Sequence, residues 1–264
     1  MRINRLSKTL LWAVSALVLS FIYVPILVVV ANSFSTSSTL TWPPPGFTTE
    51  WWTRALTNEG ALAAISTSII VALASTAIAL LLGTVLSFAL QRFEFFGKST
   101  VNLLVVLPIA LPGIVTGIAL NNAFKTIMGV QLGWATIIVA HATFCVVTVF
   151  NNVFARLKRV GTSLDEASSD LGAGIWTTFR LVTFPQIRSA LFAGGLLSFA
   201  LSFDEIIVTT FTAGSGVQTL PIFILDNMFR PNQAPIVAVI AVVMILIAIV
   251  PIYIAQRLTT SDQR

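Results

Sequence analysis

Two adjacent carboxylates, Asp204 and Glu205, interrupt an otherwise apolar segment over residues 196–211. A charged carboxylate within a membrane costs at least a few kcal/mol unless it is paired, protonated or in contact with water. We therefore expect both side chains to face a cavity, with the hydroxyl of Ser202 nearby. Two roles are open for the pair: it stabilises a helix break or gate, or it contacts a passing cation.

Three further polar side chains lie within apolar stretches and are candidates for the same path or gate. Asn121 and Asn122 come near the end of the stretch 101–124, and His141 lies inside the stretch 134–154. The asparagines and their span either line the path or serve helix packing alone. His141 is the only histidine, which excludes a multi-histidine metal site within the chain. We expect it to pack as a hydrogen-bonded residue, with a role as a ligand as the alternative.

Motifs of catalysis are missing from the sequence. It contains no H-E-x-x-H, no G-x-S-x-G and no phosphate-binding G-x4-G-K-[ST]. Cys145 is the only cysteine, so no internal disulfide is possible and redox chemistry is not expected. We therefore predict a non-catalytic chain that holds no metal or cofactor, and any nucleotide hydrolysis must come from another polypeptide.

The composition places the chain in a lipid bilayer. Hydrophobic residues make up 56% of it and charged residues 9%, whereas soluble domains have about a quarter charged residues. A helix of about twenty apolar residues crosses the hydrocarbon core. No long polar block divides the chain, so we predict one all-α membrane domain over residues 1–264 with six transmembrane helices. The predicted spans are 10–31, 61–90, 101–124, 134–154, 190–211 and 235–255.

The fifteen Lys and Arg residues alternate between the two sides of this membrane domain. If the N-terminus is cytoplasmic, only Arg54, Lys125 and Arg230 lie outside, and the other twelve, from Arg2 to Arg264, lie inside. This bias follows the positive-inside rule. It places both termini and the loop 156–188 in the cytoplasm and explains the basic charge without nucleic acid. A cleavable signal peptide is the alternative for the first span, but its apolar run of about twenty-two residues exceeds the 7 to 15 of such signals.

The third span contains residues that disturb helices. Pro108 and Pro112 lie four positions apart and must break or kink it, because each proline removes a helical hydrogen bond. Gly113 and Gly117 allow another helix to approach closely. We therefore expect this span to lie inside the bundle.

A polar segment, 165–185, separates two strongly apolar stretches. Ser163 lies three residues before Glu166, which predicts a capping box with Ser163 as the N-cap of a short helix. Gly172 then favours a helix stop, and Pro185 is expected to bar helix where the chain re-enters the membrane. Small residues on one face would let the backbone approach a partner, while an ordinary surface helix is the alternative.

The spacing in this segment resembles a known motif. Glu166-Ala167-Ser168, then Gly172 after three residues, then Val182-x-Phe184-Pro185 after nine more, is similar to the E-A-A-x3-G-x9-I-x-L-P pattern of the EAA loop in ATP-binding-cassette importer permeases. Three identities differ, at Ser168, Val182 and Phe184. The resemblance implies that the loop docks on a partner ATPase and couples ATP hydrolysis to transport. The coupling residues would be Ser163, Asp165, Glu166, Ala167, Ser168, Gly172 and Pro185.

Three other segments, 107–117, 198–205 and 219–221, look like the spermidine/putrescine branch of these permeases. The resemblance implies a type I importer permease in a bacterial inner membrane that translocates a small organic cation, most readily a polyamine. It also implies a second homologous permease subunit, two ATPase subunits that bind ATP and Mg, and an external substrate-binding protein. The alternatives are a permease for another amine, an amino-acid-like or zwitterionic solute, and a proton-coupled carrier in which Asp204 and Glu205 titrate.

Overall fold

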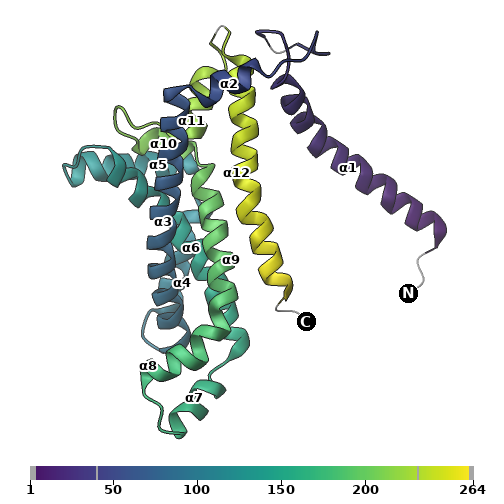
Figure 1. The fold of residues 1–264 in the computed structure, drawn as a ribbon. Coiled ribbons are helices and arrows are strands. Elements are labelled where there is room, and N and C mark those ends of the chain that lie inside the picture. The colour runs from purple at the N-terminus through teal and green to yellow at the C-terminus, as the bar shows by residue number, and fades with distance from the viewer. Residues whose placement is uncertain (1–3, 40, 231, 262–264) are drawn as a thin grey trace. The chain divides into compact units, whose positions relative to one another are not determined.

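The computed structural model describes residues 4–39, 41–230 and 232–261, so that Arg2 and Arg264 of the charge argument lie outside the described residues. Helices dominate the described part, where the only strand-like pairing is an isolated antiparallel bridge between Ser35 and Phe47. The all-α prediction is confirmed. In chain order the helices are α1 (Arg5–Asn32), α2 (Glu50–Leu56), α3 (Glu59–Arg92), α4 (Lys98–Ala110), α5 (Gly113–Asn122), the π-helix η1 (Ala123–Ile127), α6 (Trp134–Val160), α7 (Ser163–Asp170), α8 (Ile175–Thr178), the π-helix η2 (Phe179–Thr183), α9 (Phe184–Phe203), α10 (Ile207–Thr212), α11 (Leu220–Asn227) and α12 (Ala234–Ser261) (Figure 1).

The apolar helices agree with the predicted spans in number and, with one exception, in position. Within the described residues, the pair Lys98–Ala110 and Gly113–Ile127, bent by 106°, makes a sixth span if its halves are counted as one. The exception is the predicted span 190–211, because the helix there begins at Ile175 and ends at Phe203. The five unbroken candidates are Ser7–Asn32, Glu59–Arg92, Trp134–Val160, Ile175–Phe203 and Ala234–Pro251.

The chain forms two compact units, Met1–Leu62 with Ile224–Leu246 and Ala63–Phe223 with Ile247–Arg264. In the first unit, the segment after α1 folds back on α2. The ring N–H of Trp51 donates to the carbonyl of Ser35 at 2.8 Å, and the rings of Phe34 and Trp52 stack with centroids 5.3 Å apart. These contacts hold α2 against its own loop. The prediction of a single domain over 1–264 stays a prediction.

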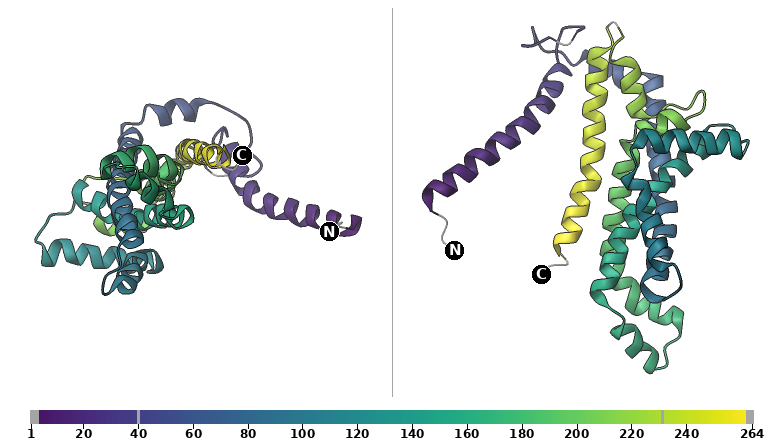
Figure 2. Two further views of the ribbon diagram at one scale, coloured as in Figure 1. Left: turned by 90° about the horizontal axis from the view of Figure 1, so that it is seen from below. Right: turned by 180° about the vertical axis from the view of Figure 1, so that it is seen from behind.

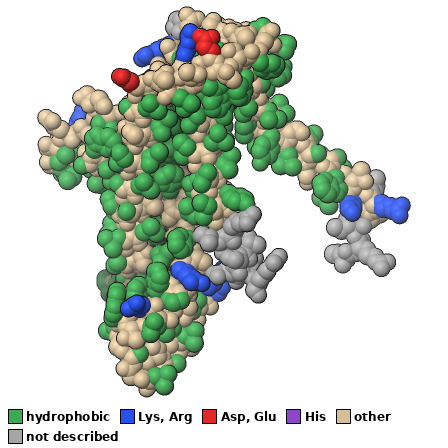
Figure 3. All heavy atoms as spheres, in the orientation of Figure 1, with side chains coloured by type: hydrophobic (Ala, Val, Ile, Leu, Met, Phe, Trp, Pro, Cys, Tyr) green, Lys and Arg blue, Asp and Glu red, His purple; other side chains and the backbone are tan. Residues whose placement is uncertain are grey.

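The second unit is built around α6, with α3 and α9 beside it (Figure 2). Val149 and Val153 of α6 are fully buried against Ala79 of α3 and Ile187 of α9. Polar contacts add to this packing, since the hydroxyl of Ser75 in α3 donates to the carbonyl of Ile138 at 3.0 Å. On the face drawn in Figure 3, the long helices present mainly hydrophobic side chains, as a protein surrounded by lipid requires.

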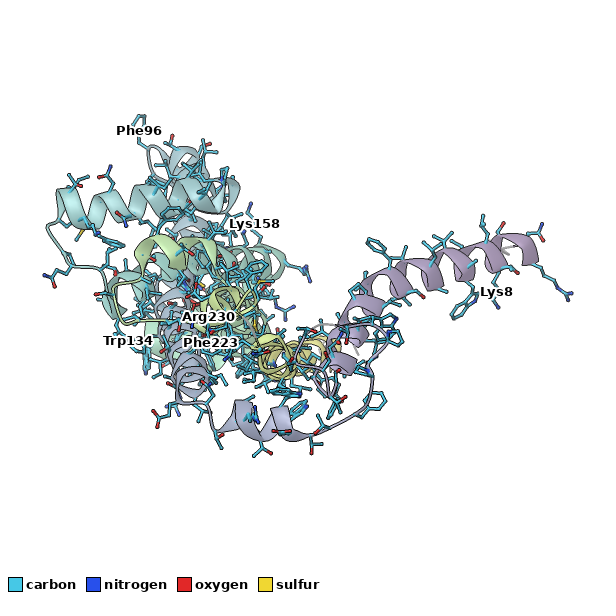
Figure 4. The ribbon with its side chains drawn as sticks, turned by 90° about the horizontal axis from the view of Figure 1, so that it is seen from above. Lys8, Phe96, Trp134, Lys158, Phe223 and Arg230 are labelled. Carbon is cyan, nitrogen blue, oxygen red and sulfur yellow. The ribbon has the colours of Figure 1, made fainter. Side chains whose placement is uncertain are left out.

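The third span differs from its prediction in one half. α4 has no buried residue, and its Leu103 and Leu104 side chains are 67% and 58% exposed. The connection that leads into α4 carries Phe96, whose exposed ring lies at the periphery of this unit (Figure 4). The expectation that the whole span lies inside the bundle is therefore wrong for α4. Apolar side chains gain little by leaving lipid for a protein interior, so proline and leucine content does not force burial.

The other half of this span, α5, does pack closely. A Cβ atom built on Gly117 would lie 2.7 Å from Cδ2 of Phe211, so only glycine lets the Phe211 side chain and α5 approach this far. Gly113 is less constrained, since its Cβ would meet Ile207 at an ordinary 3.5 Å. Pro112 lies at the expected break, because α4 ends at Ala110 and Pro112 is the N-cap of α5, whereas Pro108 lies inside α4.

Candidate functional site

The short helix α7 lies in the predicted docking loop and begins one residue earlier than expected. Its N-cap is Thr162, and Ser163 is the first helical residue. The Thr162 hydroxyl donates to Oε1 of Glu166 at 2.6 Å. The prediction of Ser163 as N-cap is therefore wrong. Thr162 and Ser163 both carry hydroxyls, and the choice between them depends on where Gly161, at φ +74°, turns the chain after α6.

Gly172 ends α7 as predicted. It follows the C-cap Leu171 and has φ +82°, in the left-handed region that favours glycine. Its N–H donates to the carbonyl of Ser169 at 2.9 Å, and the N–H of Ala173 donates to the carbonyl of Ser168 at 3.1 Å. These bonds satisfy carbonyls that the end of the helix would leave without partners.

One face of α7 is tied to the rest of the second unit. Asp165 forms an ion pair with Arg92 at the end of α3. Its other oxygen accepts a hydrogen bond from the Thr183 hydroxyl at 2.7 Å. A second tie joins the hydroxyls of Ser168 and Thr178 at 3.0 Å. Asp165 is only 15% exposed, so the ion pair is better shielded from water than most surface pairs.

The neighbouring face of α7 makes no such tie to another element within the described residues. Leu164 and Leu171 are 55% and 89% exposed, and Ala167 between them is exposed as well. At 3.6 residues per turn, these three positions share one side of the helix. The face is small and apolar, which suits docking on another protein.

Pro185 does not bar the helix, contrary to the prediction. The helical run continues from Ile175 to Phe203 over 29 residues, and Pro185 lies in the first turn of α9. The π-helical turn η2, Phe179–Thr183, directly precedes it. A π turn has a wider hydrogen-bond spacing, so it accommodates the missing N–H and the ring of the proline without ending the helix. α8 and η2 therefore continue directly into the long helix α9.

The helix breaks instead at Asp204 to Ile206. The carboxylate of Glu205 accepts a hydrogen bond from the N–H of Val208 at 2.8 Å and so caps the first turn of α10. Asp204 is exposed, and its carboxylate has no hydrogen bond or ion pair with any residue that the structure describes. The two neighbouring carboxylates thus have different surroundings. The Glu205 carboxylate is hydrogen-bonded to the backbone of α10, whereas the Asp204 carboxylate is available to bind a ligand.

His141 joins the helices on both sides of this break. It is fully buried, with Nδ1 at 2.7 Å from the Ser202 hydroxyl and Nε2 at 2.8 Å from the Thr209 hydroxyl. The Thr209 hydroxyl already donates its proton to the carbonyl of Glu205. It therefore accepts from Nε2–H, which places a proton on Nε2 of His141.

The two asparagines have separate partners. Nδ2 of Asn121 donates to the carbonyl of Phe211 at 2.5 Å, which ties α5 to α10. Oδ1 of Asn122 accepts from the hydroxyl of Thr126 one turn later, at 2.7 Å. Asn121 therefore belongs to the group that positions α10, whereas Asn122 bonds within its own helical segment.

The structure thus gathers the candidate residues at the two ends of α9. The coupling candidates lie at its start. Ser202, Asp204 and Glu205 lie at its end, with His141 beside them. Sequence reasoning missed Arg92, Thr178 and Thr183, each of which bonds a predicted residue. Only Arg92 had a signal, as a basic residue facing an acidic loop. Among the described residues, no group of three or more His, Cys, Asp and Glu side chains is placed to hold a metal ion.

Comparisons with known proteins agree with this arrangement. Residues 79–261 match the family described as binding-protein-dependent transport system inner membrane component. The chain is 33% identical over 245 residues to the spermidine/putrescine transport system permease protein PotC of Escherichia coli (strain K12), covering 92% of this chain and 91% of that protein. It is 32% identical over 227 residues to the putrescine transport system permease protein PotI of the same strain, covering 82% and 80%. A chain of a bacterial ABC transporter involved in the import of the acidic polysaccharide alginate has the same fold, with a TM-score of 0.70, 14% identity and 99% of both chains covered.

The fold and these matches define a multi-pass permease subunit of an importer, a non-catalytic component of the inner membrane. The chain belongs to the family of binding-protein-dependent transport system inner membrane components. The resemblance predicted from the loop 166–185 is confirmed. Membership implies ATPase subunits and a substrate-binding protein as partners.

Proposed function

We propose that this chain imports a polyamine, driven by ATP hydrolysis that reaches it through α7. The observation that carries the proposal is the uninterrupted helical run from Ile175 to Phe203. α7 is tied to this run through Thr178 and Thr183 at one end, and the run ends at the break with Asp204 at the other. A movement of α7 is thereby passed to the break without a flexible joint between them.

The chemistry of the break supports a cationic cargo. Asp204 is an exposed carboxylate without a partner among the described residues, next to a helix end that Glu205 caps. An ammonium group of a polyamine is a natural counter-ion for such a carboxylate. The two relatives are named as permease proteins of spermidine/putrescine and putrescine transport systems, which supports a polyamine as the cargo. Other small amines and zwitterions are the second candidates, because they also carry an ammonium group.

The proposed assembly has four kinds of subunit. Two ATPase subunits bind ATP and Mg, and one of them receives α7 of this chain. A second, homologous permease subunit completes the path, and a binding protein delivers the cargo from outside. Both termini and α7 lie on the cytoplasmic side in this arrangement, in line with the twelve basic residues that the charge bias puts there.

Ala167→Glu tests the docking of α7. The side chain of Ala167 is exposed, and glutamate is a good helix former, so the substitution leaves the folded chain intact while adding a charge to the free face of α7. Burial of an unpaired charge at an interface costs about 2 kcal/mol or more, so ATP-driven polyamine uptake in vesicles with the complete transporter should fall at least about tenfold. Phe96→Glu is the matched control, since it adds the same charge to an exposed side chain outside α7.

Normal uptake by the Ala167→Glu transporter would refute the docking role of α7. Uptake by this chain alone under a proton gradient would favour the alternative function, a proton-coupled carrier. A complete transporter that moves an amino acid or another zwitterion but no polyamine would refute the proposed substrate and leave the docking role in place.

A further inference from the structure

The loop between α1 and α2, residues 33–49, is a folded element of the first unit (Figure 1). Its two arms are hydrogen-bonded to each other, since the N–H of Thr48 donates to the carbonyl of Phe34 at 2.6 Å and the N–H of Thr36 donates to the carbonyl of Gly46 at 3.0 Å. A Cβ atom built on Gly46 would lie 3.1 Å from the hydroxyl oxygen of Thr36, so the arms pack closely. The loop, called the aromatic loop below, therefore has a defined surface.

The burial of side chains in the aromatic loop is the reverse of that in a loop surrounded by water. Ser33 and Ser35 are fully buried, whereas the rings of Trp42 and Phe47 are 66% and 74% exposed. The buried serines are held in place, because the hydroxyl of Ser33 donates to the carbonyl of Val30 at 2.7 Å. In water, burial of the two aromatic rings in place of the serines would be favourable. The loop is therefore suited to surroundings that are themselves partly apolar.

An open groove of about 610 Å³ lies beside the exposed ring of Phe47. It is lined by two aromatic residues, Phe34 and Phe47, and two threonines, Thr48 and Thr49. The hydroxyl oxygen of Thr48 accepts from the N–H of Glu50 at 3.2 Å and donates to no residue that the structure describes. Aromatic rings with hydroxyl donors beside them match the layer of a phospholipid bilayer in which acyl chains meet ester and phosphate oxygens.

The aromatic loop begins where a membrane span ends. α1 contains the candidate span Ser7–Asn32, with a mean hydropathy of 2.6, so its end at Asn32 brings the first residues of the loop to the membrane surface. Tryptophan is enriched at this depth, because its ring is apolar while its N–H bonds to water or lipid. α2 shows which side faces water, since Glu50 and Arg54 form an exposed ion pair on one side of it and Trp51 is buried on the other.

A protein partner is the other class of occupant for this surface. Surfaces that receive another protein in a transient complex have a polar rim, and their charged groups steer the encounter. Residues 33–49 contain no charged side chain. The aromatic loop therefore offers no charge that could orient a protein, whereas a neutral aromatic surface suits the interface of a bilayer.

We propose that the aromatic loop lies in the interfacial layer of the membrane, with the rings of Trp42 and Phe47 among phospholipids and a lipid acyl chain in the groove. In the orientation proposed above, this is the outer leaflet. The loop thereby holds α2 at the membrane surface, because the carbonyl of Ser35 binds the ring N–H of Trp51 in α2. The inference goes beyond the proposed function and depends neither on the cargo nor on the docking of α7.

A nitroxide probe tests the depth of the aromatic loop in the complete transporter, reconstituted in lipid nanodiscs. Thr41→Cys carries the probe next to Trp42, in a transporter without other cysteines, in which Cys145→Ala removes the only cysteine of this chain. Thr53→Cys is the matched control, because Thr53 is exposed on the same side of α2 as Glu50. Power saturation compares collisions of the probe with oxygen, which concentrates in lipid, and with a nickel chelate, which stays in water.

We expect the ratio of oxygen to nickel collisions to be higher at position 41 than at position 53. Trp42→Ser with Phe47→Ser should lower the ratio at position 41 to the value at position 53. Trp42→Tyr with Phe47→Trp should keep the ratio high, because both positions remain aromatic. Equal ratios at positions 41 and 53 with Trp42 and Phe47 in place would overturn the proposal.

A second measurement separates lipid from a protein partner. Loaded binding protein added to the nanodiscs should leave both collision rates at position 41 unchanged. In uptake by vesicles, the concentration of binding protein that gives half-maximal rate should be the same for Trp42→Ser with Phe47→Ser as for the unchanged loop. A fall in both collision rates when the binding protein is added, or a rise in that concentration in the double variant, would place a protein on the loop and refute the membrane contact.

Discussion

Removal of the His141 side chain tests whether it clamps the helix break. His141→Phe keeps a planar ring of similar size but deletes both hydrogen bonds, to Ser202 and to Thr209. Hydrogen bonds between membrane helices contribute about 0.6 kcal/mol each, with a maximum near 1.7. The orphaned hydroxyls add little, because Thr209 already donates to its own helix through the carbonyl of Glu205. We therefore expect a loss of about 1 to 2 kcal/mol in the free energy of unfolding.

The assay is a pair of double-mutant cycles, with unfolding followed in mixtures of mild detergent and sodium dodecyl sulfate. His141→Phe is combined with Ser202→Ala in one cycle and with Thr209→Val in the other, and each coupling energy should be about 0.6 kcal/mol. Thr143→Val is the control on the same helix, since its hydroxyl bonds only within α6, to the carbonyl of Ala140. Coupling energies of zero in both cycles would show that His141 merely fills space and would remove the argument that it holds α9 and α10 together.

Two other predictions concern the same region. Asp204→Asn should lower uptake of a polyamine more than it lowers ATP hydrolysis stimulated by the loaded binding protein, because it removes a cation contact and leaves the cap from Glu205 in place; equal losses would place Asp204 in gating instead. Gly117→Ala should destabilise the protein, since the overpacking against Phe211 costs about 1 to 3 kcal/mol while the gain in helix propensity is about 1. In a Phe211→Ala background the loss should be smaller, because the ring is gone and only Cβ of residue 211, at 3.1 Å, still crowds the site. Thermal unfolding in detergent measures both losses, and equal losses in the two backgrounds would contradict the close approach of α5 and the Phe211 ring.

Local sequence patterns predicted those features that depend on neighbouring residues. The spacing from Glu166 to Gly172 located α7 and its end, because a helix stop needs only a glycine free to adopt positive φ. Pro112 likewise located the break in the third span. The bend of 106° between the two halves could not be predicted from the sequence pattern, because proline removes a hydrogen bond without fixing the direction in which the chain continues.

Features that depend on contacts between distant segments were missed. Thr209 meets His141 across 68 positions and Arg92 meets Asp165 across 73, and the sequence does not say which distant residues pair. The prediction for Pro185 was wrong for a different, local reason. A proline stops a helix only when the preceding turn cannot rearrange, and the π turn of η2 does rearrange here.

The length of the helical run through Pro185 determines how far one end of the run moves when the run tilts about its other end. Its 29 residues make a rod of roughly 40 Å at 1.5 Å per residue. Tilting such a rod by about 5° about its foot shifts its tip by roughly 3 to 4 Å, about the width of an aliphatic chain. A small displacement at the α7 end can thus move the break at the other end by that distance without disturbing local packing.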